Sequence, residues 1–146
     1  LFIVNDYPDV AVLSGADGLH LGQEDLSISE ARKILGKDKI IGISCHNLRQ
    51  ALKAQKDGAD YIGIGPIYAT ATKPEYRPIG LKVLRQLKTK IKIPYFAIGD
   101  IREANIKHIV SAGATRVAVC RAILKSKNIQ SAAKELLNHL THPGGA

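Results

Sequence analysis

Short β-forming runs alternate with longer helical patterns along the whole of this chain. We count six such pairs, each an apolar run of four or five residues followed by a stretch with helical periodicity. The alternation is typical of successive βα units on a parallel sheet, whose strands lack strict polar alternation because both of their faces are buried. The predicted strands span residues 1–5, 18–21, 40–44, 61–65, 95–98 and 115–119.

Local signals mark where several of the helices begin and end. Ser27 and Glu30 form a capping-box pattern, which predicts a helix that runs to about Leu35 and ends at Gly36. A weak repeat, Gly-Ala followed by Asp or Thr, lies between a helix and the next strand at three places, starting at Gly15, Gly58 and Gly113. Each Gly suits a left-handed cap, and the Asp or Thr is expected to hydrogen-bond its own backbone in the turn.

The ends of the strands decide between two architectures. Six βα units fit either an open doubly wound sheet or part of an eight-stranded barrel. Nearly every predicted strand ends in small or polar residues, namely Asn5-Asp6, Gly22-Gln23, Ser44, Gly65, Gly99-Asp100 and Cys120-Arg121. Such a ring of functional groups is how a β/α barrel builds its active-site mouth. We therefore predict an α/β fold of the TIM-type (β/α)8 barrel class, present as six βα units in residues 1–140, with a flexible tail at 141–146.

The charge of the chain excludes some partners. A net charge of +8 and a pI near 9.6 favour anionic partners, but only 5% of the residues are aromatic, which argues against the stacking platforms of nucleic-acid binders. The densest basic cluster is predicted to be the solvated face of a helix whose apolar face is Leu81, Leu84 and Leu87. Its members are Lys82, Arg85, Lys88, Lys90 and Lys92.

Nothing in the sequence indicates a membrane protein or a secreted one. No apolar run reaches the roughly 18 to 20 residues of a membrane span, and no secretory signal opens the chain. Cys45 and Cys120 lie far apart, without the spacing of a zinc site or a disulfide framework. A reducing, cytoplasmic compartment fits best. Because Met is absent even at position 1, we expect the chain to be part of a longer one.

Several residues at the strand ends are candidates for chemistry. Gly99 and Cys120 follow the last two strands, where β/α barrels commonly bind a phosphate on backbone amides, although Gly99 also suits a plain tight turn. Asp6, Glu24 and Asp25 follow the first two strands and could either ligate Mg²⁺ or cap turns. The long loop 66–79 is a candidate lid, and its Lys73 could supply a mobile cation. His20 is interpreted as a structural histidine.

Six segments along the chain form a specific pattern. They are Asn5-Asp6, His20-Leu21-Gly22-Gln23-Glu24-Asp25-Leu26, Gly42-Ile43-Ser44, Asp60-Tyr61-Ile62-Gly63-Ile64-Gly65-Pro66-Ile67-Tyr68, Thr70-Ala71-Thr72-Lys73 and Ala97-Ile98-Gly99. In order and spacing, these segments resemble the thiamine-phosphate synthase family, and the resemblance covers the whole chain. The resemblance implies a β/α barrel that joins hydroxymethylpyrimidine diphosphate to a thiazole phosphate with Mg²⁺, giving thiamine phosphate and pyrophosphate.

Site residues follow from the resemblance, position by position. Asp6 and Asp25 are implied as the magnesium ligands. The implied contacts to the pyrimidine diphosphate are Asn5, Ser44 and Lys73, of which Lys73 and Ser44 are implied as catalytic. The implied contacts to the thiazole phosphate are Thr70, Thr72, Gly99, Asp100, Cys120 and Arg121.

The chain departs from the family pattern in two ways. Asp100 stands where the family usually has a second Gly, and we expect Arg121 to offset its charge, unless Asp100 turns outward as a helix N-cap. The family's first two strands, with a Gln-x-Arg-x-Lys segment that grips the diphosphate, have no counterpart. We therefore expect a fragment that is inactive alone, with open sheet edges that favour self-association as a homo-oligomer or aggregate.

Two other functions remain open at the level of sequence. A thiazole tautomerase of the same pathway would carry a histidine where this chain has Pro66. The alternative from another class is a noncatalytic phosphate-binding protein, inactive because of the missing strands and Asp100. No nucleic acid and no membrane partner is expected.

Overall fold

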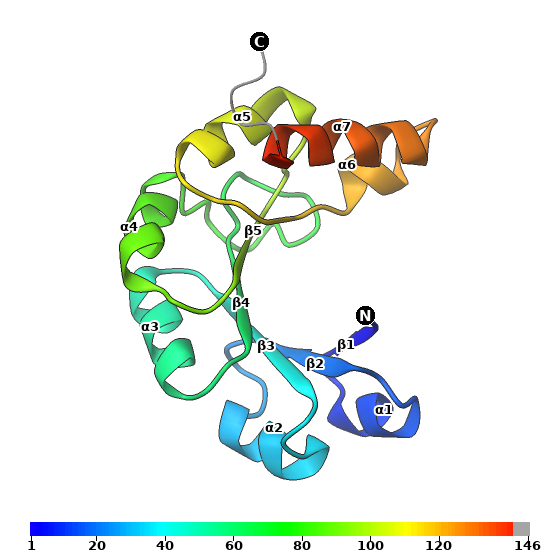
Figure 1. Ribbon diagram of the computed structural model, residues 1–146, viewed down its shortest axis with the longest axis vertical. Helices are drawn as coiled ribbons and strands as arrows, with labels where there is room; N and C mark the ends of the chain where they lie inside the picture. The colour runs from blue at the N-terminus through cyan, green and yellow to red at the C-terminus, as the bar shows by residue number, and fades with distance from the viewer. Residues whose placement is uncertain (142–146) are drawn as a thin grey trace.

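The computed structural model describes residues 1–141, which form one parallel sheet with helices on its outer side (Figure 1). The sheet has six strands in the order of the chain, each parallel to the next, as the βα pattern predicts. The strands are β1 (Ile3–Asn5), β2 (Gly18–Leu21), β3 (Ile40–Cys45), β4 (Tyr61–Ile64), β5 (Tyr95–Ile98) and β6 (Val117–Ala118). The helices are α1 (Pro8–Leu13), α2 (Ile28–Leu35), α3 (Leu48–Lys56), α4 (Lys82–Lys90), α5 (Glu103–Ser111), α6 (Arg121–Leu124) and α7 (Ile129–Thr141).

The sheet curves into an arc that does not close. Helices α2 to α5 follow its convex side, and α6 and α7 lie at one end of the arc while β1 and α1 lie at the other (Figure 1). Within residues 1–141, β1 pairs only with β2, and β6 pairs only with β5. The prediction of six units of a TIM-type barrel is confirmed. The predicted tail at 142–146 lies outside the described residues, whereas Thr141 ends α7.

The two outermost strands are shorter than predicted. β1 starts at Ile3 rather than residue 1, and β6 spans two residues of the five predicted at 115–119. An edge strand has a neighbour on one side only, so fewer ladder hydrogen bonds hold its ends. The amide of Phe2 donates instead to the carboxylate of Asp17, at 2.6 Å.

The helix-end signals are confirmed. Ser27 caps α2 in a capping box with Glu30, and Gly36 ends it with φ of +85°. The three repeat glycines, Gly15, Gly58 and Gly113, all have positive φ and each follows the C-cap residue of a helix.

The expected role of the repeat's Asp was wrong. Asp60 accepts from the amide of Ile41 at 2.7 Å and pairs with Arg32, so it fastens the neighbouring strand β3 and helix α2 rather than its own turn. Asp17 does the equivalent for Phe2. At its two Asp positions the repeat therefore ties adjacent βα units together at the end of the sheet where the strands begin.

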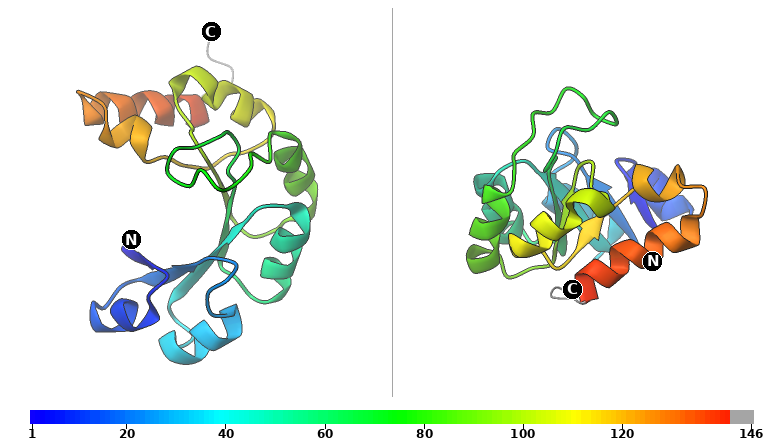
Figure 2. Two further views of the ribbon diagram at one scale, coloured as in Figure 1. Left: turned by 180° about the vertical axis from the view of Figure 1, so that it is seen from behind. Right: turned by 90° about the horizontal axis from the view of Figure 1, so that it is seen from above.

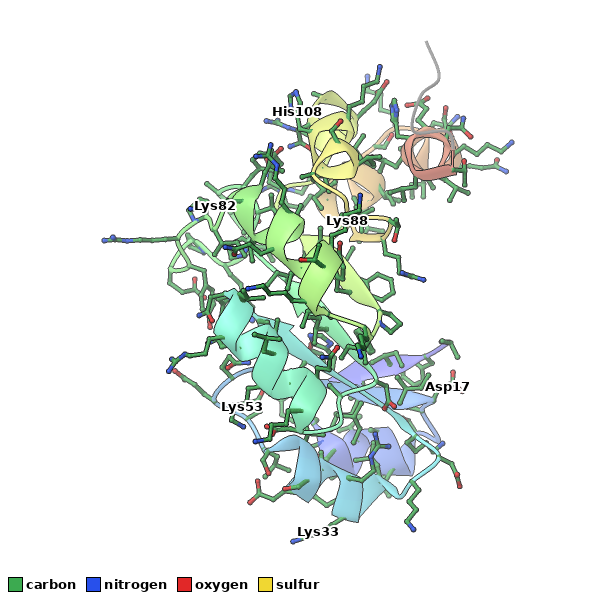
Figure 3. All side chains as sticks on the ribbon, turned by 60° about the vertical axis from the view of Figure 1, so that its left-hand side comes forward. Asp17, Lys33, Lys53, Lys82, Lys88 and His108 are labelled. Carbon is green, nitrogen blue, oxygen red and sulfur yellow. The ribbon has the colours of Figure 1, made fainter. Side chains whose placement is uncertain are left out.

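The core lies between the sheet and the helices. Leu19, Ile41 and Ile62 come from the strands, and Leu84 and Ile106 from the helices, and all five are fully buried. On α4 the buried face is Val83, Leu84 and Leu87, while Leu81 is half-buried. The basic cluster at 82–92 is exposed, as predicted, and Lys82 and Lys88 lie on the outer helix layer (Figure 3). No helix in residues 1–141 is long and apolar enough to span a membrane.

The open edges lead us to expect self-association of the chain. Unpaired N–H and C=O groups at β1 are a template for another strand, and Phe2 beside them is 55% exposed. Light scattering after size exclusion should give a mass that rises with protein concentration. Phe2→Lys should weaken the association, whereas Leu137→Lys, on α7, should not. A monomer at all concentrations would contradict the prediction.

Candidate active site

A cavity of about 370 Å³ lies at the carboxyl ends of the strands. Ten of the eleven predicted site residues line it: Asn5, Asp6, Ser44, Thr70, Thr72, Lys73, Gly99, Asp100, Cys120 and Arg121. Parallel strands point their carboxyl ends the same way, so residues more than 100 positions apart meet at one mouth. Asp25, the eleventh, is not among the lining residues.

Two carboxyl groups adjoin at the ends of β1 and β2. Asp6 adopts a left-handed backbone, with φ of +68°, and its amide donates to the carbonyl of His20 at 2.8 Å. The carboxylate of Asp25 accepts from the amide of Gly22, which holds it beside the strand end. Burial and the neighbouring Asp25 carboxyl raise the pKa of Asp6, and Lys73 opposes that shift. A positive charge placed between these two carboxyl groups would therefore stabilise their ionised forms.

The long loop 66–79 contributes both threonines and Lys73 to the cavity. It rises above the rest of the molecule at the end where the strands terminate (Figure 2, right). The ring of Tyr76 stacks on His46 with centroids 4.5 Å apart, and the Lys73 ammonium lies 5.9 Å from the Tyr76 ring. His46 in turn hydrogen-bonds the carbonyl of Gly65 at 2.6 Å. This stack joins the tip of the loop to the end of β3.

The loop stack gives a direct prediction. Tyr76→Ala should raise the rate of cleavage after Glu75 by a glutamate-specific protease about fivefold, because an aromatic pair contributes about 1 kcal/mol. Tyr76→Phe keeps the ring and should be cleaved like the unmodified chain. Equal cleavage of the alanine and phenylalanine variants would show that the stack does not hold the loop.

The ends of β5 and β6 form the predicted phosphate region. Gly99 has φ of +114°, and a Cβ there would lie 2.6 Å from the Cα of Pro66, so only glycine fits between the two loops. Cys120 is exposed and immediately precedes α6, which begins at Arg121.

The expected pairing of Asp100 with Arg121 was wrong. Within residues 1–141 the carboxylate of Asp100 has one ion-pair partner, the guanidinium of Arg102, at 3.8 Å. Asp100 has φ of +44°, and its carbonyl accepts from Asn105 at 2.9 Å. Nor is Asp100 the N-cap of α5, since Arg102 takes that position. The left-handed backbone at Asp100 turns its side chain toward the following residues rather than across to β6.

Four polar side chains that line the cavity were not among the predicted site residues: His20, Gln23, His46 and Tyr76. His20 has satisfied hydrogen bonds, as its structural interpretation predicts, but it also lines the cavity, and burial lowers its pKa. Gln23 donates to the carbonyl of Ser44 at 2.6 Å. The sequence does carry a signal for His20 and Gln23, since His20 alternates with two leucines in a strand and Gln23 follows the end of that strand. Residues 1–141 contain no cluster of three or more histidine, cysteine or acidic side chains suited to a metal.

Comparisons with known proteins agree with this geometry. The sequence model of the family described as thiamine monophosphate synthase matches residues 1–123. The thiamine-phosphate synthase of Synechococcus sp. (strain WH7803) is 50% identical over 141 residues, which are 97% of this chain and 40% of that protein. The one from Shouchella clausii is 44% identical over 93% of this chain and 66% of its own length. This chain thus spans between two fifths and two thirds of the length of these relatives.

Solved structures give the same result. Thiamine phosphate pyrophosphorylase from Pyrococcus furiosus superposes with a TM-score of 0.89 at 38% identity, over 99% of this chain and 69% of that one. A 3-hexulose-6-phosphate synthase matches at 21% identity with a TM-score of 0.62, which shows a shared fold alone. The family match, the identities and the arrangement of the cavity together show that this chain belongs to the thiamine monophosphate synthase family.

Proposed function

We propose that the protein containing this chain joins hydroxymethylpyrimidine diphosphate to hydroxyethylthiazole phosphate, giving thiamine phosphate and pyrophosphate. The observation that carries the proposal is the convergence of anion-binding and cation-binding groups in one cavity. The Lys73 ammonium, two threonine hydroxyls and the Gly99 backbone suit phosphate groups, and the adjoining carboxyls of Asp6 and Asp25 suit a cation.

The chemistry needs no protein nucleophile. The bond between the pyrimidine methylene carbon and the diphosphate oxygen breaks, and pyrophosphate leaves with the electron pair. The lone pair of the thiazole nitrogen then forms the new C–N bond. The chain's task is to stabilise the departing charge and to align the thiazole nitrogen, which electrostatic groups in fixed positions do well. Lys73 donates hydrogen bonds to the leaving diphosphate, and Asn5 and Ser44 orient the pyrimidine diphosphate.

The thiazole phosphate would bind across the cavity from the diphosphate, held by Thr70, Thr72 and the backbone at Gly99. Asp100 and Arg121 both line this region, and the ion pair of Asp100 with Arg102 draws its charge toward α5. The departure from the family's Gly-Gly is therefore compatible with phosphate binding. Cys120 contributes a backbone amide next to Arg121.

The residues fit magnesium as the metal. Mg²⁺ is bound through one or two carboxylates plus substrate phosphates, and the raised pKa of Asp6 indicates that its carboxyl lacks a sufficient positive partner. Asp6 and Asp25 would hold the ion, and its chemistry there is to neutralise the diphosphate. We further propose a cytoplasmic enzyme with small phosphorylated substrates as its partners.

The test is thiamine phosphate formation, measured by fluorescence after oxidation to thiochrome. Two proteins are compared: this chain, and this chain extended at its N-terminus by the corresponding part of the Pyrococcus furiosus relative. We expect product from the extended protein only with Mg²⁺, and none from the chain alone. Full activity after complete removal of divalent metal would contradict the magnesium assignment. An extended protein that folds and binds neither substrate would contradict the function.

The second candidate is a noncatalytic phosphate-binding chain. The observation that favours it is the open sheet, because the cavity has protein on fewer sides than a closed barrel provides. Calorimetric binding of thiazole phosphate by an extended protein that forms no product would support it.

A further inference from the structure

Three polar side chains are joined by hydrogen bonds inside the curve of the sheet. The hydroxyl of Tyr61 on β4 lies 2.8 Å from Nδ1 of His20 on β2, and Nε2 of His20 lies 2.9 Å from Oγ of Ser44 on β3. Ser44 and His20 line the cavity, whereas Tyr61 lies beneath it. Tyr61 has no role in the function proposed above.

Gly42 makes room for these hydrogen-bonded side chains. His20 is level with Gly42 on the neighbouring strand, and Gly42 is level with Tyr61. A Cβ at Gly42 would lie 2.1 Å from the Tyr61 ring, and one at Gly63 would lie 3.4 Å from the His20 ring. The ring of Tyr61 thus occupies the space that a side chain at position 42 of β3 would fill, and the ring of His20 reaches across β3 to contact position 63 of β4.

Further contacts hold Tyr61 and Ser44, the two outer members of this hydrogen-bonded set, in place. The ring of Phe96 packs edge-on against Tyr61, with centroids 5.6 Å apart at 82°. At the other end, Gln23 donates to the backbone carbonyl of Ser44 at 2.6 Å. The three side chains therefore have little freedom to exchange partners.

The direction of the two hydrogen bonds follows from the acidity of the two hydroxyl groups. A neutral imidazole has one N–H and one nitrogen that accepts, so only one of the two hydroxyls can donate to it. The phenol of Tyr61, with an ordinary pKa of about 10, is far more acidic than the aliphatic hydroxyl of Ser44 and is the better donor. In residues 1–141 the imidazole is also the only hydrogen-bond partner of the Tyr61 hydroxyl. Tyr61 then donates to Nδ1, and Nε2–H donates to Ser44.

We propose that Tyr61 and His20 are positioning residues that fix Ser44 as a hydrogen-bond donor toward the ligand. Because Oγ of Ser44 accepts from Nε2–H, its own hydrogen is free to point into the cavity. Ser44 can then donate to an acceptor atom on the ligand, such as a ring nitrogen. The identity of that ligand as the pyrimidine diphosphate rests on the function proposed above.

The first test reads the tautomer of His20 directly, without a ligand. The unmodified chain is labelled with ¹⁵N-histidine, and the two ring nitrogens are distinguished by their shifts and long-range couplings. His20→Gln, which lacks the signal, assigns it. We expect the proton on Nε2. A proton on Nδ1 would overturn the inference, because Ser44 would then donate to the imidazole and present only lone pairs to the ligand.

The second test uses the N-terminally extended protein described above and measures its affinity for hydroxymethylpyrimidine diphosphate by calorimetry, with Mg²⁺ and without thiazole phosphate. Tyr61→Phe keeps the ring and its packing but removes the donor, and should weaken binding severalfold. His20→Ala should weaken it about tenfold, and His20→Gln, whose amide N–H can still reach Ser44, should recover most of the loss. Tyr95→Phe, on β5, is the matched control and should bind normally.

The outcomes separate the two proposals. Unchanged affinity in both Tyr61→Phe and His20→Ala would overturn the positioning role. If the extended protein without substitutions does not bind the diphosphate, the assignment of that ligand fails, and the tautomer alone then decides the inference.

Discussion

Gly99→Ala is expected to lower the free energy of unfolding by about 2–6 kcal/mol, because backbone strain and overpacking each contribute about 1–3 kcal/mol. A Cβ at position 99 would meet the backbone of Pro66 and Ile67 at 2.6 and 2.7 Å, and backbone atoms cannot move aside as a flexible side chain can. The residue also has φ of +114°, which side-chain-bearing residues rarely adopt. Urea unfolding followed by circular dichroism measures the change.

Gly58→Ala is the matched control for this variant. Gly58 also has positive φ, of +89°, but a Cβ there would meet nothing within 4 Å. The control carries the left-handed penalty alone and should lose about 1 kcal/mol. Similar losses in both variants would mean that the contact between the loop after β5 and the loop after β4 does not restrict position 99. Thiazole-phosphate affinity should fall in Gly99→Ala and stay unchanged in Gly58→Ala, since only Gly99 lines the cavity.

The fold could be predicted because its signals are local. The capping box at Ser27, the glycines that follow helices and the apolar runs each depend on a few neighbouring residues, and parallel pairing of consecutive strands follows from the βα order. Strand ends were less predictable, since their length depends on how many neighbours supply hydrogen bonds. β6 is short for that reason.

The members of the site could be predicted better than their partners. Topology alone brings the ends of parallel strands together, so Asn5 and Arg121 were expected at one mouth. Partners depend on backbone angles and on register between strands, which no local pattern encodes. Asp100 pairs with Arg102 because its backbone is left-handed, and His20 reaches Tyr61 only because Gly42 lies between them.

The second large effect is expected at the carboxyl pair. Asp25→Asn should weaken Mg²⁺-dependent binding of pyrophosphate tenfold or more, because one of two charged metal ligands is lost. Asp6→Asn should do the same. Asp38→Asn removes an exposed carboxylate ahead of β3, at the opposite end of the sheet, and controls for the change in net charge. Calorimetry with and without Mg²⁺ measures the affinities. Equal affinity in all three variants would remove the pair from the site.

Asp6→Asn should also stabilise the metal-free fold, and this sets it apart from an ordinary loss of function. Burial and Asp25 raise the pKa of Asp6 above its ordinary value of 3.8, so its ionised form is less favourable in the folded chain than in the unfolded one. The folded state therefore loses stability as the pH rises through the pKa of Asp6, and asparagine removes that loss. Thermal unfolding should show a higher midpoint for Asp6→Asn at pH 7, and the pH-dependent part of this gain should vanish below pH 3.8, where Asp6 is protonated in both states. A variant that is less stable at pH 7 would mean that Asp6 already has a favourable positive partner, and that the carboxyl pair has no need of a metal ion.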